Sequence, residues 1–119
     1  MPLPGDASAR RAADLLHEAR SRERAGCVPE AIERYQAAIA TAEATGERTV
    51  LAEALRRLAV VRHHCNESGL SRDLCHRSYS VARAIGNNLL AAEALNTLGG
   101  IDLATSSLVD ARKAFLEAL

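Results

Sequence analysis

Residues 92–99 read Ala-Glu-Ala-Leu-Asn-Thr-Leu-Gly, and residues 111–118 read Ala-Arg-Lys-Ala-Phe-Leu-Glu-Ala. Small and apolar residues recur in both stretches at intervals of three, four and seven, which is the period of an α-helix with one apolar face. Both stretches align with similar positions earlier in the chain when the sequence is compared with itself at a fixed offset. The aligned sets are 12, 52 and 92; 15, 55 and 95; 19, 59 and 99; 31, 71 and 111; 35, 75 and 115; and 38, 78 and 118. The sequence therefore predicts three repeats, each made of two helices.

Glycines mark where several of these helices end. Gly46 and Gly86 occupy equivalent places in successive repeats, and glycine just past a helix takes the left-handed conformation at low cost. The predicted helices are 8–25, 29–45, 49–66, 71–85, 89–105 and 108–119, with turns around Asn66 to Leu70 and Thr105 to Ser107. We expect a disordered leader at 1–7 and a single domain at 8–119, with repeats at about 8–47, 48–87 and 88–119, the last one truncated.

The order of small and large residues in these repeats resembles the tetratricopeptide repeat family. The resemblance is carried by Leu15, Ala19, Ala31, Tyr35 and Ala38 in the first repeat, and by Leu95, Leu98, Gly99, Ala111, Phe115 and Ala118 in the third. The middle repeat departs from the pattern, with Ser71, Cys75 and Ser78 where the family usually has alanine, an aromatic residue and alanine. The 40-residue period is longer than the usual 34 and is similar to the long repeats of kinesin light chains.

This resemblance implies an all-α fold, a right-handed α-solenoid of three antiparallel helix pairs with six helices. HEAT and armadillo arrays also have a period near 40 and are the alternative. The pattern at Ala111, Phe115 and Ala118 favours the tetratricopeptide interpretation because it sets the close packing of paired helices.

Composition excludes several classes of partner. Fifteen acidic and fifteen basic residues give a formal net charge of zero, so the chain lacks the electrostatic footprint of a nucleic-acid or anionic-membrane binder. No apolar run reaches the length of a membrane helix, and Asp14 and Glu18 interrupt what would have to be the apolar part of a signal peptide. Three cysteines, an odd and small number, agree with a reducing compartment. We therefore expect a cytoplasmic protein.

The resemblance also implies a binding groove, because the first helix of each tetratricopeptide pair lines the concave face. The groove residues expected here are Arg20, Arg24, Arg56, Val60, His63 and Asn96. Guanidinium groups pair bidentately with carboxylates, so the expected partner is a protein or peptide segment, with acidic character. The alternative is that these arginines are ordinary surface residues, paired with Glu23 and Glu53.

One cluster of residues has the chemistry of a metal or thiol site. His63, His64 and Cys65 precede the turn of the middle repeat, and Cys75 and His76 follow it. Adjacent residues on a helix point about 100° apart, so the first three cannot all face one ion, and the spacing matches no standard zinc signature. Nor does the sequence contain a phosphate-binding glycine loop or an evident nucleophile with its base. We predict no metal, no cofactor and no catalytic activity.

The third repeat offers a second surface for interaction. The apolar residues Leu108, Phe115, Leu116 and Leu119 would be partly uncovered in a monomer, whereas solenoids normally finish with a polar cap. Two explanations fit, a homodimer that stacks through these residues or a segment of a longer array. The two predicted functions are therefore a non-enzymatic scaffold that binds a peptide or helix in its groove, and a self-association module.

Overall fold

The computed structural model of this chain describes residues 4–118, and the side chains of residues 11–117. Every regular element in this part of the chain is an α-helix. The helices are α1 (Pro4–Arg24), α2 (Val28–Thr45), α3 (Arg48–His64), α4 (Ser68–Ala84) and α5 (Asn88–Ala118). The predicted all-α class is confirmed for these residues.

Each of the four turns between helices contains one residue with positive φ. These residues are Gly26 (79°), Gly46 (75°), Asn66 (63°) and Gly86 (70°), and they are evenly spaced along the chain. Glycine adopts this conformation without a side-chain penalty, and asparagine tolerates it better than most residues do. At each turn the next residue donates its N–H to a carbonyl five residues earlier, over 2.9 to 3.0 Å. These bonds satisfy helix-end carbonyls that would otherwise lack partners.

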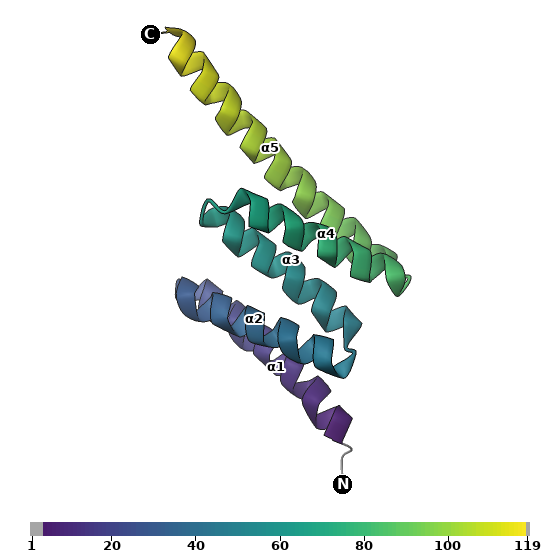
Figure 1. Cartoon of the computed structure of the whole chain (residues 1–119). Helices are drawn as coiled ribbons and strands as arrows, with labels where there is room; N and C mark the ends of the chain where they lie inside the picture. The colour runs from purple at the N-terminus through teal and green to yellow at the C-terminus, as the bar shows by residue number, and fades with distance from the viewer. Residues whose placement is uncertain (1–3, 119) are drawn as a thin grey trace.

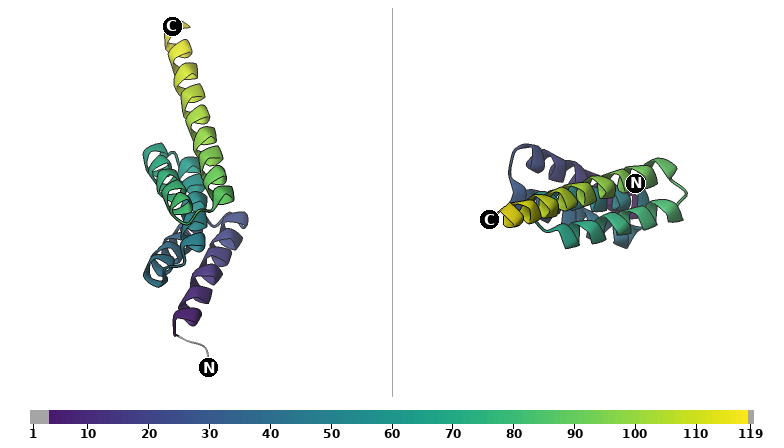
Figure 2. Two further views of the ribbon diagram at one scale, coloured as in Figure 1. Left: turned by 90° about the vertical axis from the view of Figure 1, so that its right-hand side faces the viewer. Right: turned by 90° about the horizontal axis from the view of Figure 1, so that it is seen from above.

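Successive helices lie side by side, and the chain reverses direction at each turn (Figure 1). The helices thus stack one on the next in a particle whose extents are 70 × 32 × 18 Å. Helices α2 and α4 form one layer, and α1, α3 and α5 form the other (Figures 1 and 2). Most of the buried side chains lie in helices α1 to α4, and several are alanines with no exposed surface, including Ala12, Ala19, Ala31, Ala38 and Ala59. Such small residues let helix backbones approach closely, as the repeat pattern predicts.

The middle repeat uses serine where the first repeat uses alanine, and both serines are buried. The hydroxyl of Ser71 donates to the carbonyl of Ala59 (2.5 Å), and that of Ser78 donates to the carbonyl of Ala52 (2.6 Å). A serine hydroxyl can be buried at low cost when it is hydrogen-bonded. These two bonds therefore join α3 to α4, and all four residues stand at positions that align across the repeats.

The third repeat differs from the prediction. Residues 89–105 and 108–119 were expected to be two helices, yet α5 continues through Thr105 to Ser107, so the described residues form five helices and not six. No glycine or asparagine stands at this point, and serine does not readily adopt the positive φ that each of the other turns uses. The N-terminal prediction also differs, because residues 4–7 are helical in α1 and not part of a disordered leader. Residues 1–3 lie outside the described part.

Candidate functional site

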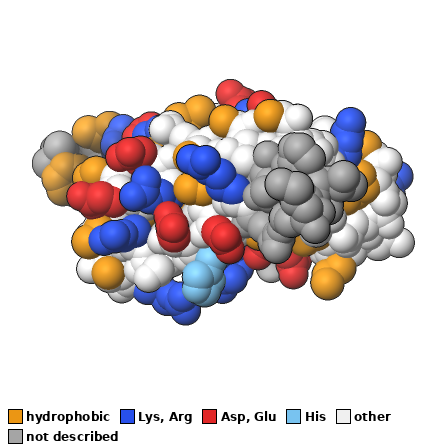
Figure 3. All heavy atoms as spheres, turned by 90° about the horizontal axis from the view of Figure 1, so that it is seen from below, with side chains coloured by type: hydrophobic (Ala, Val, Ile, Leu, Met, Phe, Trp, Pro, Cys, Tyr) orange, Lys and Arg blue, Asp and Glu red, His pale blue; other side chains and the backbone are white. Residues whose placement is uncertain are grey.

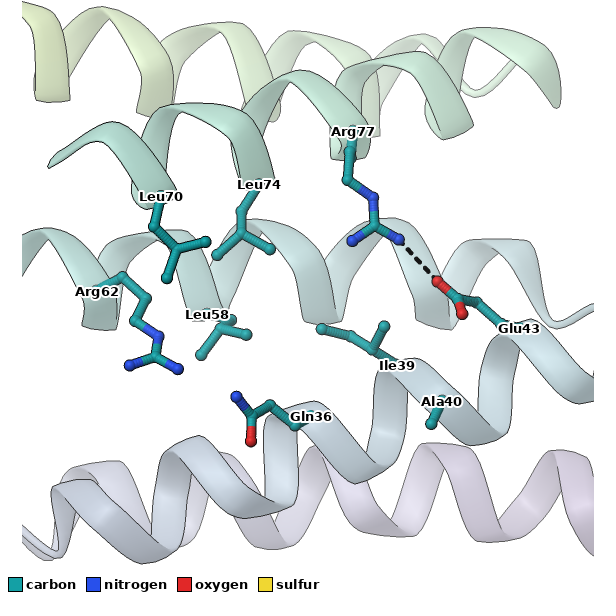
Figure 4. A pocket seen from close by; sticks show the side chains of 9 residues that line it. All are labelled: Gln36, Ile39, Ala40, Glu43, Leu58, Arg62, Leu70, Leu74 and Arg77. Atoms are coloured by element: carbon teal, nitrogen blue, oxygen red, sulfur yellow. Dashed lines mark hydrogen bonds and ion pairs between the residues drawn. The ribbon is translucent and has the colours of Figure 1, made fainter. Parts of the chain in front are cut away.

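A recess opens between α2 and α4, which make no close backbone contact with each other, and α3 forms its floor (Figure 4). Its volume is about 340 Å³, at the lower end of the range of ligand-binding clefts. The lining residues are Gln36, Ile39, Ala40 and Glu43 from α2, Leu58 and Arg62 from α3, and Leu70, Leu74 and Arg77 from α4. Four of the nine are Leu or Ile, so the interior of the recess is largely apolar.

The apolar side chains differ in how far they are covered. Leu58 and Leu74 are 3% and 6% exposed and belong to the core, whereas Leu70 is 43% exposed at the mouth. Leu70 and Leu74 are one helical turn apart on α4 and point toward the same space (Figure 4). An apolar side chain from another molecule would cover Leu70 and contact the core directly.

Charged side chains border this apolar interior. Nη2 of Arg77 lies 2.7 Å from Oε1 of Glu43 and joins α4 to α2 across the recess (Figure 4). Nη1 of Arg62 lies 3.2 Å from Oε1 of Glu67. An apolar centre with charges at its rim is the arrangement found in protein-binding surfaces.

The sequence prediction missed this recess. It started the fourth helix at residue 71, which left Leu70 in the turn, whereas α4 begins at Ser68. The available signal was the spacing of Leu70, Leu74 and Arg77, which places all three on one side of a helix next to the buried positions.

The predicted groove residues lie on α1, α3 and α5, the layer opposite α2 and α4. Arg56, Val60 and His63 are half-buried and share one face of α3 at helical spacing. Nη2 of Arg56 is 3.8 Å from Oε2 of Glu93 on α5. Arg24 and Asn96 are exposed. The structure thus brings three of the six predicted residues together on α3, while Arg20 is half-buried on α1 and Arg24 and Asn96 lie on the surrounding surface.

Two polar atoms in this groove are buried and have no hydrogen-bond partner among the described residues, Nε of Arg56 and Nδ1 of His63. The main-chain carbonyls of α3 do not provide a hydrogen-bond partner for these atoms, because they already accept hydrogen bonds within the helix. The face of α3 that carries Val60 therefore retains hydrogen-bonding capacity.

Arginines of this layer also lie beside the buried residues at positions 35 and 75. The pKa of the Tyr35 hydroxyl is raised above its ordinary value, mainly by burial. The hydrogen bond that it donates to Glu23 (2.6 Å) and the negative charge of Glu23 raise this pKa further, whereas the positive charges of Arg57 and Arg20 lower it. Burial likewise raises the pKa of the Cys75 thiol, against the opposing charge of Arg56. Both groups stay protonated at neutral pH, so Cys75 is not an activated nucleophile.

The histidines and cysteines of the middle repeat are not arranged around a common point. Cys75 is buried and Cys65 is exposed, and the rings of His63 and His64 have their centroids 5.7 Å apart. Within the described residues, no three His, Cys, Asp or Glu side chains are placed to hold a metal ion.

The predicted oligomer face is on the second half of α5. Leu108, Phe115 and Leu116 are 60%, 66% and 61% exposed, while Leu119 lies outside the described residues. Leu95 and Leu103, on the first half of the same helix, are 50% and 70% exposed. Helix α5 therefore exposes apolar side chains on both of its halves, beyond the residues that the sequence indicated.

Elsewhere the surface is mixed in charge. Acidic and basic side chains are interspersed over the described part of the face in Figure 3, in line with the net charge of zero. None of the described helices combines the length and hydropathy needed to cross a bilayer.

Comparison of the chain with protein-family models, with curated proteins and with solved structures finds no significant match. The chemistry of the recess, of the α3 face and of α5 is therefore the basis for assigning a function.

Proposed function

We propose that this chain is a tetratricopeptide-like solenoid that binds a segment of another protein and catalyses no reaction. The observation that supports this most directly is the recess between α2 and α4, where the half-exposed Leu70 lies over the core residues Leu58 and Leu74. The repeated helix pairs supply a rigid frame, because each pair packs on the next one.

The occupant of this recess is an apolar side chain, or two neighbouring ones, on a short helix or extended peptide. The recess volume of about 340 Å³ accommodates side chains of this size, and burying one Leu-sized side chain stabilises a complex by about 1.5 to 3 kcal/mol. Arg62, Arg77 and Glu43 at the rim then orient the segment by polar contacts. Binding through this recess alone is weak, so a partner needs additional contacts to reach micromolar affinity.

A second candidate is the predicted groove on α1, α3 and α5, favoured by the unpartnered Nε of Arg56 and Nδ1 of His63. Arg56 can donate a hydrogen bond, and His63 can donate or accept one, after a small side-chain movement. Together with Arg20, they suit an acidic segment, because charge-assisted hydrogen bonds to carboxylates are the stronger kind.

The proposal is tested by selecting peptides from a random displayed library on the purified chain and mapping their binding by methyl NMR. We expect selected peptides to shift the methyl signals of Ile39, Leu70 and Leu74. Leu70→Asp should weaken their binding about tenfold or more, since it removes an apolar contact of roughly 1.5 kcal/mol or greater. The matched control is Leu89→Asp, at a residue that is 70% exposed on α5 and does not line the recess.

Binding that moves the Val60 methyls and is lost in Arg56→Glu, with Leu70→Asp unchanged, would assign the function to the second candidate. If no peptide is enriched, or if binding survives both substitutions, the proposed function is wrong.

A further inference from the structure

The recess between α2 and α4 has different chemistry at its two ends. Arg62 and Gln36 lie at one end, Arg77 and Glu43 lie at the other, and Leu58 lies between them (Figure 4). A segment bound in the recess therefore meets apolar side chains in the middle and polar groups on either side.

The two arginines differ in how much water reaches them. The side chain of Arg77 is 54% exposed, whereas that of Arg62 is only 18% exposed. Arg62 is one helical turn from Leu58 on α3, so an occupant that covers Leu58 also removes water from Arg62. A guanidinium group that loses water without gaining acceptors is costly to bury. Arg62, and not Arg77, therefore sets a condition on what binds in the recess.

Arg62 also has donors that lack an acceptor. Both carboxylate oxygens of Glu67 accept from Nη1 of Arg62, at 3.2 and 3.3 Å. Nε of Arg62 is buried and has no hydrogen-bond partner among the described residues. A guanidinium group carries five N–H donors in a fixed fork, so the edge formed by Nε and Nη2 is still available. Two parallel N–H groups on one edge match the two oxygens of a carboxylate.

We propose that this recess binds segments that carry an Asp or Glu beside the apolar side chain, and that Arg62 binds this carboxylate through Nε and Nη2. A small rotation of the Arg62 side chain opens this edge toward the recess. Because Leu58 and Arg62 are one turn apart, the carboxylate lies about 6 Å from the apolar side chain of the segment.

This preference presupposes the binding of a protein segment proposed above and specifies which segments bind. Segments without a carboxylate bind less tightly because they remove water from Arg62 and return no charged acceptor. Segments with a lysine or arginine at the same place are repelled by the guanidinium group.

Three tripeptides test the preference. They are Leu-Ala-Glu, Leu-Ala-Gln and Leu-Ala-Lys, each acetylated at the N-terminus and amidated at the C-terminus, so that they differ only in the last side chain. Titrations are followed by the methyl NMR signals of Ile39, Leu58 and Leu74. We expect Leu-Ala-Glu to bind in the millimolar range, about tenfold more tightly than Leu-Ala-Gln, and Leu-Ala-Lys to bind most weakly.

Three variants locate the preference on Arg62. Arg62→Gln should lower the affinity for Leu-Ala-Glu to that for Leu-Ala-Gln, because the charged donor is lost. Glu67→Gln should raise the affinity for Leu-Ala-Glu, because a competing carboxylate is removed. The matched control is Arg72→Gln, which removes the same charge from a residue of α4 that does not line the recess, and it should keep the preference.

Equal binding of Leu-Ala-Glu and Leu-Ala-Gln would show that the carboxylate preference is wrong, although the recess would remain a binding site. A preference that Arg72→Gln abolishes as fully as Arg62→Gln would also overturn it, because the effect would then come from overall charge. If none of the three tripeptides moves the methyl signals, the preference is likewise wrong, and the peptide selection described above decides the proposed function by itself.

Discussion

Positions 35 and 75 illustrate how one place in the repeat is occupied by different side chains. Tyr35 and Cys75 are both without exposed surface, yet Tyr35 carries a hydroxyl that needs a partner and finds Glu23 at 2.6 Å. On either side of the smaller Cys75, the hydroxyls of Ser71 and Ser78 donate to carbonyls of α3. The departure of the middle repeat from the family pattern is therefore a different way of filling the same contact.

Removal of the Tyr35 hydroxyl should change both stability and its pH dependence. Because Tyr35→Phe deletes the bond to Glu23, we expect the free energy of unfolding at neutral pH to fall by about 1 to 3 kcal/mol. In the folded chain the pKa of Tyr35 is raised above 10.0, mainly by burial. The unfolded chain therefore loses this proton first, and stability decreases as pH rises through about 10.

Urea unfolding at about pH 8 and about pH 10.5 measures the effect on both sides of this transition. The loss of stability between the two should be smaller in Tyr35→Phe than in the parent chain. Tyr79→Phe is the control, because this tyrosine is only partly buried. Equal losses in the parent chain and Tyr35→Phe would show that Tyr35 does not control the alkaline transition.

At the scale of the helices, the sequence predicted the turns that contain a residue suited to positive φ. Gly46 and Gly86 recur at the repeat period, and both end a helix in the structure. Thr105 to Ser107 looked like a turn because Thr and Ser are common in turns, but no residue there favours the left-handed conformation, so the helix continues. The recess was predictable only in part: the spacing of Leu70, Leu74 and Arg77 indicates one of its walls, whereas its opening depends on the separation of α2 from α4, which local periodicity does not determine.

Two glycines should respond to alanine in opposite directions. An added Cβ would meet no atom within 4 Å at Gly46 or at Gly100, so steric clashes with neighbouring residues do not separate them. Gly46 has φ 75°, and Gly46→Ala should cost about 1 kcal/mol. Gly100 lies inside α5 with helical backbone, and Gly100→Ala should stabilise by about 0.5 to 1 kcal/mol.

Thermal and urea unfolding of the two variants, side by side, measure this difference. Each glycine serves as the control for the other, because the change in side chain is identical. A decrease in stability for both would mean that α5 is not helical at residue 100 under the conditions used.

At the scale of the whole molecule, three ion pairs among the described residues join helices that belong to different repeats. They are Arg77–Glu43 between α4 and α2, Arg56–Glu93 between α3 and α5, and Arg72–Asp102 between α4 and α5. The side chains of Arg72 and Asp102 are 47% and 49% exposed, and ion pairs at this exposure contribute little because water and salt screen them. The buried small residues, and not these ion pairs, hold the repeats together.

Removal of one of these ion pairs should therefore have little effect. We expect Arg72→Ala to lower the free energy of unfolding by less than about 1 kcal/mol, and sodium chloride at molar concentration to reduce even this difference. Denaturant unfolding at low and high salt provides the measurement. A loss of several kcal/mol would show that the charges contribute as much as the packing does.

The continuous α5 is what distinguishes the third repeat from the first two, and the place where a turn would fall can be read from the spacing of the others. Positive φ occurs at 26, 46, 66 and 86, and the next position in this series is Ser106. Glycine there removes a penalty of about 1 to 2 kcal/mol for the left-handed conformation and also weakens the continuous helix. We therefore expect Ser106→Gly to favour a sixth helix that folds back within one copy, so that Phe115 covers Leu95 of its own chain.

A pair of cysteines measures this change within one chain. In a background with Cys27→Ser and Cys65→Ser, Gly99→Cys and Ala111→Cys should form an internal disulfide when combined with Ser106→Gly, because a turn there brings the two residues together. Ser106→Ala is the matched control, because alanine favours the continuous helix, and it should give no internal disulfide, since the two positions are about 18 Å apart along an unbroken helix. No internal disulfide in Ser106→Gly would indicate that the missing left-handed residue is not what keeps α5 continuous.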